Sequence, residues 1–248
     1  MNKFNGVFQK VQSLTVFGLF MLGMSLGSVK AQDKADGTID QDYYKISSME
    51  VVELESEAPQ ELENFVSLRH DSSNKGLSGY IMAADQLIAL GQKVWTIVEK
   101  GRPVVSSDLG TVSVLPEELR TNGGFSARLS GWSAPKQATY RVVYKNLYGM
   151  EVVNFKFTIH FQYNGQYQGK GRYISGATMA ANNLDVAWGY SFNAKSEVVS
   201  ITNRGSEANP VAGLTLRLSY AVSTVLKDSR STYDFHLTGT GGVSGIGF

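Results

Sequence analysis

The residues of this 248-residue chain best suited to acid–base or metal chemistry are its three histidines and one nearby aspartate. His160 lies on the polar face of an alternating stretch. Asp234 precedes His236 by two residues, so both lie on one face of a strand. If those two strands are neighbours, Asp234, His236 and His160 could form a facial metal site. His70 lies in a polar, loop-like stretch, RHDSSNKG. Solvated histidines on a sheet surface explain the pattern more simply, and we predict no metal and no cofactor.

The sequence motifs for a catalytic nucleophile or a bound nucleotide give little support to an enzymatic function. The G-x-S-x-G match, GMSLG at 23–27, lies in an apolar N-terminal stretch rather than between a strand and a helix. GTGGVSGIG at 239–247 has neither dinucleotide nor phosphate-loop spacing, and we expect a flexible tail or an edge strand there. The chain has no cysteine, which excludes disulfides, thiol nucleophiles and zinc–thiolate sites. We therefore nominate no catalytic residue.

Aromatic and amide side chains gather in the segment YNGQYQGKGRY, residues 163–173. Aromatic faces with a few convergent polar groups are typical of ligand sites, so this segment is the candidate binding site. Its candidate residues are Tyr163, Asn164, Gln166, Tyr167 and Tyr173. A hairpin with cross-strand tyrosines needs no ligand, and this structural interpretation stays open beside the functional one.

The candidate binding residues belong to the stretch 152–174, which alternates apolar and polar side chains as a half-buried strand does. One face carries Val153, Phe155, Phe157, Ile159, Phe161 and Tyr163. The dipeptide Asn164-Gly165 favours a type I′ turn. We therefore predict that the chain reverses at Asn164-Gly165 and returns through residues 166–174 as a hairpin.

Residues 80–101, YIMAADQLIALGQKVWTIVEKG, are predicted to form one amphipathic helix. The apolar residues that recur at three- and four-residue spacing are Leu87, Leu90, Val94, Ile97 and Val98. Alternating or β-branched stretches then predict strands at 111–115, 125–132, 139–146, 184–194, 196–202, 213–224 and 231–239, besides the two hairpin arms. About eight or nine short strands with Gly, Asn and Pro turns indicate an antiparallel β-sandwich preceded by the helix.

A small β-barrel is the alternative fold, because alternation alone does not say whether an apolar face meets a core or lipid. Phe248 and Ile246 resemble the closing residues of bacterial outer-membrane barrels. Ser244, Gly242 and Thr240 depart from that family's apolar pattern, so the resemblance covers only a few residues. The predicted helix needs an apolar surface to cover, which favours the sandwich.

The N-terminal residues 1–31 have the pattern of a secretory signal peptide. Lys3 and Lys10 precede an apolar run, Leu14–Leu26, and Val29-Lys30-Ala31 places small side chains where a signal peptidase cleaves. Residues 32–66 then hold ten Asp or Glu against two Lys. We predict an acidic, poorly ordered arm over 32–78 and a domain of helix plus strands over 79–248.

These patterns predict an exported bacterial envelope protein, periplasmic or at the cell surface, that acts as a non-catalytic binding or structural β-sandwich. A small outer-membrane β-barrel protein is the alternative, and an enzyme of unknown class is the third interpretation. The candidate partners are an envelope protein, a peptide or a carbohydrate. Nucleic acid is excluded because the basic residues are scattered singly. After cleavage of the signal peptide, we expect no membrane-spanning helix.

Overall fold

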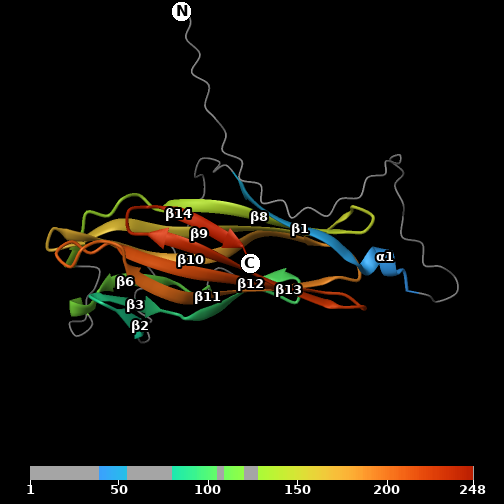
Figure 1. Cartoon of the computed structure of the whole chain (residues 1–248), viewed down its shortest axis with the longest axis horizontal. Coiled ribbons are helices and arrows are strands. Elements are labelled where there is room, and N and C mark those ends of the chain that lie inside the picture. Colours follow the sequence, from blue (N-terminus) through green and yellow to red (C-terminus); the bar gives the residue numbers. More distant parts are fainter. Residues whose placement is uncertain (1–38, 55–79, 105–108, 120–127, 248) are drawn as a thin grey trace, which may run out of the picture. The chain divides into compact units, whose positions relative to one another are not determined.

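The computed structural model describes residues 39–54, 80–104, 109–119 and 128–247. A single unit runs from Asp40 to Phe248, and its described strands form two antiparallel sheets packed face to face (Figure 1). Within these ranges both sheets keep their edges and do not join into one closed barrel. The predicted β-sandwich is therefore confirmed.

Eight described strands form the first sheet, in the order β1-β8-β9-β10-β6-β3-β2, with β7 paired to β9. Their bounds are β1 (Ile46–Leu54), β8 (Lys136–Asn146), β9 (Glu151–Tyr167), β10 (Lys170–Val186), β6 (Val112–Pro116), β3 (Leu87–Gly91), β2 (Tyr80–Ala84) and β7 (Leu129–Ser130). The second sheet has six described strands, in the order β14-β13-β12-β11-β4-β5. Their bounds are β14 (Val243–Gly247), β13 (Asp228–Thr238), β12 (Ala212–Ser223), β11 (Ser191–Asn203), β4 (Val94–Glu99) and β5 (Arg102–Pro103). The one α-helix in the described ranges, α1 (Gln41–Tyr44), precedes β1, and a 3₁₀ helix, Glu117–Leu119, follows β6.

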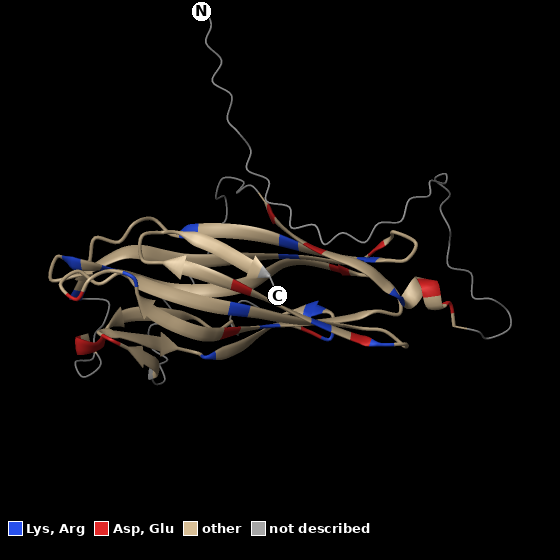
Figure 2. Ribbon diagram, in the orientation of Figure 1, with Lys and Arg blue, Asp and Glu red and all other residues tan. Residues whose placement is uncertain are grey.

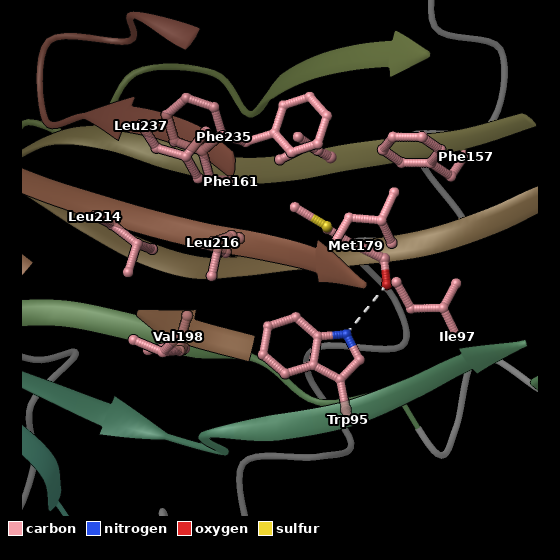
Figure 3. Close-up of a cluster of buried hydrophobic side chains, with 14 of the residues drawn as sticks. Trp95, Ile97, Phe157, Phe161, Met179, Val198, Leu214, Leu216, Phe235 and Leu237 are labelled. Carbon is pink, nitrogen blue, oxygen red and sulfur yellow. Dashed lines mark hydrogen bonds between the residues drawn. The ribbon is translucent and has the colours of Figure 1, made fainter. Parts of the chain in front are cut away.

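The inward faces of the long strands make a shared aromatic and aliphatic core (Figure 3). Phe157 of β9 is fully buried and meets Phe235 of β13 edge to face, with ring centroids 5.7 Å apart. Trp95 of β4 donates from Nε1 to the backbone oxygen of Met179 on β10 at 3.3 Å, which joins the two sheets. Each buried side chain of this size contributes about 1.5–3 kcal/mol of transfer free energy to folding.

The helix predicted over residues 80–101 is wrong, because this segment forms β2, β3 and β4. Asp85, with a left-handed φ of 52°, reverses the chain between β2 and β3. Gly91, with a φ of 134°, ends β3 before the chain crosses to β4 in the second sheet. The apolar runs between these turns are only a few residues long. A run of that length has no period that separates a helix from a buried strand. The spacing of three and four therefore arose from short strands interrupted by turns.

The predicted hairpin exists, but its turn lies at Gln168-Gly169 rather than at Asn164-Gly165. Gln168 and Gly169 have φ of 51° and 74°, as a type I′ reversal requires. Asn164 is also left-handed, with φ of 64°, but the strand continues past it. Pairing with β10 shifts register close to this residue. The Asn-Gly signal therefore marks an irregularity inside β9, not its end.

Two boundaries also differ from the sequence predictions. The strand predicted at 184–194 is wrong, because β10 ends at Val186 and β11 begins at Ser191. The poorly ordered arm predicted over 32–78 is wrong for residues 40–54, where α1 and β1 form and β1 pairs with β8 along its length. Ile46 and Val51 of β1 are half-buried against the core, and the pairing with β8 orders this part despite its charge.

The remaining strand predictions overlap observed strands. The stretches predicted at 111–115, 139–146, 196–202, 213–224 and 231–239 coincide with parts of β6, β8, β11, β12 and β13. The glycine-rich stretch 239–247 contributes an edge strand, β14. The proposed signal peptide, residues 55–78 and the start of the strand predicted at 125–132 lie outside the described residues. Across the ranges that the structure describes, no helix has the length and apolarity to cross a membrane.

Candidate functional site

The predicted binding segment is only partly at the surface. Tyr173 is 4% exposed and belongs to the core, where burial, and after it the charges of Glu118 and Tyr167, raises the pKa of its hydroxyl. Tyr163 is half-buried and packs against the core. Tyr173 is therefore a core side chain, and its contact with a ligand stays a prediction.

Asn164 has a structural role that the sequence did not reveal. Its backbone N–H donates to the Gly239 oxygen at 2.8 Å, and its Nδ2 donates to Ser133 Oγ at 2.7 Å. Gly239 lies between β13 and β14 in the second sheet, whereas Asn164 belongs to the first. The residue therefore ties the two sheets together at this end, and its amide is already engaged.

Gln166 and Tyr167 remain partly exposed at the same end. Gln166 pairs with Ser130 of β7. The Arg128 guanidinium carbon lies 5.4 Å from the centroid of the Tyr167 ring, and its Nη2 donates to the Tyr167 hydroxyl at 3.0 Å. A ligand contact at Gln166 and Tyr167 therefore stays a prediction, and Arg128 lies beside Tyr167.

The hypothetical facial metal site does not form. His160 lies on β9 in the first sheet and His236 on β13 in the second, so their strands are not neighbours. Asp234 accepts two hydrogen bonds of 2.7 Å from Arg217, and His236 Nδ1 bonds Thr215 Oγ1 at 3.0 Å. No group of three metal-ligating side chains comes together in the part of the chain that the structure describes.

The opposite end of the sandwich, where α1 lies (Figure 1), is organised around one buried side chain. Asn146, at the end of β8, is fully buried. Its Nδ2 donates to the Tyr43 backbone oxygen at 3.2 Å, and its Oδ1 accepts from the backbone N–H groups of Tyr148 and Met150 at 3.1 and 3.0 Å. A single amide thus fixes both α1 and the turn between β8 and β9.

Tyrosines connect the same helix to the turn between β10 and β11. The Tyr190 hydroxyl donates to the Tyr43 backbone oxygen, and the Tyr43 hydroxyl donates to the Trp188 backbone oxygen at 3.0 Å. Burial raises the pKa of Tyr190 to about 12; the neighbouring Tyr43 adds to this effect. These contacts hold the backbone on both sides of Trp188 while leaving the indole itself outside the core.

Large apolar side chains are exposed at the tips of three turns at this end. They belong to the first turn, between β8 and β9, the second turn, between β10 and β11, and the third turn, between β12 and β13. We call this set the apolar end, and it comprises Leu147, Tyr148, Met150, Trp188, Val225 and Leu226. Trp188 is 75% exposed, Val225 62% and Tyr148 52%. Such side chains on neighbouring turns are not explained by packing.

Hydrogen bonds and strand register bring the three turns to one end. The Leu147 N–H donates to the Lys45 oxygen at 3.0 Å, which sets the first turn beside α1. The contacts of Tyr43 set the second turn on the same helix. Ser191 at the start of β11 and Ser223 at the end of β12 are register partners, so the second turn, which leads into β11, and the third turn, which follows β12, lie at adjacent strand ends. The three tips therefore lie together rather than on separate faces.

A shallow, open depression of about 420 Å³ lies next to the apolar end. It is lined by the start of β1, by Tyr144 of β8 and by the segment that runs from the third turn into β13. Its polar wall comprises Ser47, Ser48, Lys227, Asp228, Ser229, Arg230 and Ser231. Lys227 directly follows Leu226, so charged and apolar groups adjoin within two consecutive residues.

The sequence did not reveal this site, because Trp188 falls in the strand predicted at 184–194 and residues 225–227 lie between two predicted strands. A Trp or a Val-Leu pair at a turn position, where Gly, Asn, Asp and Ser are usual, is the signal that could have revealed it. No family model, curated protein or solved structure matches this chain. Function is therefore inferred from the surface chemistry alone.

Proposed function

We propose that the protein is an exported envelope protein that acts without catalysis, as a binding module whose binding surface is the apolar end. The clustering of six exposed apolar side chains on three turns carries this proposal. Single exposed apolar residues are normal on any protein, but a group of them on neighbouring turns marks an interaction site. Loops that a rigid scaffold positions are also where binding residues concentrate.

The scaffold under the apolar end supports a preformed binding surface. Asn146, Tyr43 and Tyr190 are buried and hydrogen-bonded, and together they fix α1 and two of the three turns. A surface that is already ordered loses less conformational entropy on binding than a mobile one. The side chains of Trp188 and Leu226 can therefore be changed without removing the hydrogen bonds of Asn146, Tyr43 and Tyr190.

The proposal of export depends on the sequence. A basic leader, an apolar run and small residues at Val29 and Ala31 match a signal peptide. A chain without cysteine is also compatible with an oxidising compartment, because it has no thiol to protect. We place the protein in the periplasm or at the cell surface on these grounds.

The test is retention in the cell envelope of the source organism. Trp188→Ser and Leu226→Ser, combined in one variant, should release the protein from the envelope fraction. Val94→Ser and Ile246→Ser form the matched control, because these residues are 46% and 51% exposed but lie on β4 and β14. Both variants should melt close to the wild type, since exposed substitutions usually change stability by about 0.5 kcal/mol or less. Equal retention of the two variants would refute the proposed binding surface.

A further inference from the structure

We infer that the apolar end attaches the protein to the surface of a lipid bilayer; this inference depends on the proposed binding function and names its partner. The six side chains project from three separate turns rather than forming one continuous packed face. A protein partner of ordinary interface size needs roughly 800 Å² of well-packed surface on each side. Separate projecting turns suit insertion among lipids better.

The residue types at the apolar end match the depth profile of a membrane surface. Tryptophan and tyrosine favour the interfacial layer, because each has an apolar body and a polar group that stays in contact with water. Trp188 supplies such an indole. Tyr148 does so with its hydroxyl at 3.2 Å from both carboxylate oxygens of Asp40. Val225 and Leu226, at the tip of the third turn, have no polar group and are suited to the acyl layer.

Charges around the apolar end are balanced in sign. Two sets of five side chains near α1 and the ends of β8, β9, β10 and β13 oppose each other in sign. The cations are Lys45, Arg141, Lys145, Lys227 and Arg230, and the anions are Asp40, Asp42, Glu151, Asp185 and Asp228. Figure 2 shows blue and red segments interspersed at the α1 end, with neither colour dominant. A surface that bound anionic lipid would need clustered Lys and Arg. The balance points instead to zwitterionic headgroups and to insertion of apolar side chains as the main driving force.

The open depression gives a place for such a headgroup. Lys227 and Arg230 can face a phosphate, and Asp228 between them can face an ammonium group. Lys227, which lines the depression, directly follows Leu226 in the sequence, so a charged and an apolar side chain adjoin there. This adjacency suits a phospholipid, whose charged headgroup adjoins its acyl chains.

Flotation with vesicles tests this inference directly. Protein purified from the envelope fraction is mixed with phosphatidylcholine vesicles, with and without added phosphatidylglycerol, at low and at high salt. Wild type should float with both vesicle types at similar levels, with little dependence on salt. The Trp188→Ser/Leu226→Ser variant should lose roughly ten-fold or more in vesicle affinity, because two large apolar side chains no longer insert. The Val94→Ser/Ile246→Ser control should float as the wild type does.

Tryptophan quenching locates the inserted surface. Lipids brominated in the acyl chain should quench Trp188 and leave Trp95 and Trp132 unquenched. Trp95 is 4% exposed and lies in the core, and Trp132 packs beside Gly165 at the opposite end of the sandwich. The Trp188→Phe variant should lose the quenchable signal.

The outcomes separate this inference from the proposed function. Wild type that fails to float, or that floats equally well with and without the two apolar side chains, overturns lipid attachment. If envelope retention nevertheless depends on those side chains, the partner is a protein, and the proposed function stands without the lipid. If retention does not depend on them either, both are overturned. Flotation that appears only with anionic vesicles and vanishes at high salt also contradicts the inference.

Discussion

Asn146 on β8 donates from its side-chain amide to the backbone oxygen of Tyr43 at 3.2 Å, across 103 residues of sequence. The same side chain accepts from the N–H groups of Tyr148 and Met150. The residue is fully buried, and its hydrogen bonds replace those that water would make to three backbone groups. The apolar end is thus supported by a fully buried polar side chain.

Replacing Asn146 with Ala should loosen α1 and the first turn together. Backbone groups left without a partner cost about 1–3 kcal/mol, so the free energy of unfolding should fall by that amount. Hydrogen exchange of the Tyr148 and Met150 amides should also accelerate. The control is Asn183→Ala, an exposed residue of β10, which should change neither quantity. Unchanged exchange in Asn146→Ala would show that the amide does not hold the turn.

The core of the sandwich should depend on Phe157. This ring is fully buried between the sheets, and removing a buried Phe side chain typically costs about 3–5 kcal/mol. Phe157→Ala should therefore lower the melting temperature strongly. Lys156→Ala, on the opposite face of the same strand, should change it little. Chemical denaturation of the two variants makes the comparison, and equal losses would contradict the assigned faces.

Stability should decline at alkaline pH. Burial raises the pKa of Tyr190 to about 12 in the folded protein, and it also raises the pKa of Tyr140 and Tyr220, whereas an unfolded tyrosine titrates near 10. Between these values the unfolded chain loses its protons first. The stabilising contribution is therefore complete below about pH 10 and is lost as the pH rises through the folded pKa. Melting curves from pH 8 to 12 measure this.

A Tyr190→Phe variant controls for that decline. The fall in melting temperature above pH 10 should be shallower in this variant, because one tyrosine fewer ionises on unfolding. A wild-type melting temperature that stays constant up to pH 12 would show that the buried tyrosines titrate normally.

Export should remove residues 1–31 and leave Gln32 at the N-terminus. The basic leader and the Val-Lys-Ala end motivate this prediction. N-terminal sequencing of the protein from the envelope fraction checks it. A mature chain that still begins at Met1 would contradict cleavage.

The sequence predicted the strand content better than the turns. The alternation of β9 and β12 shows plainly which faces are buried, because each strand keeps a period of two over many residues. Asn164-Gly165 misled because the preference of that dipeptide for left-handed backbone serves a strand irregularity as well as a turn. Short runs such as Leu87–Leu90 carry no period, so the helix predicted there was an error of local pattern.

Most of the candidate site could not be predicted from the sequence, for a different reason. The apolar end brings together residues near 147, 188 and 226, and only the strand order makes those turns neighbours. No local pattern contains that order. Tyr173 was nominated because tyrosine can serve either a core or a binding surface, and burial is decided by the partner sheet.

Cross-linking from position 188 in living cells measures most directly whether the apolar end is the binding surface. A photo-activatable amino acid replaces Trp188 in one strain and the exposed Val94 in another, and the products are compared after irradiation. We expect abundant adducts with an envelope component, lipid or protein, from position 188 and few from position 94. Equal yields from the two positions, or none from position 188, would contradict the proposed role of the apolar end.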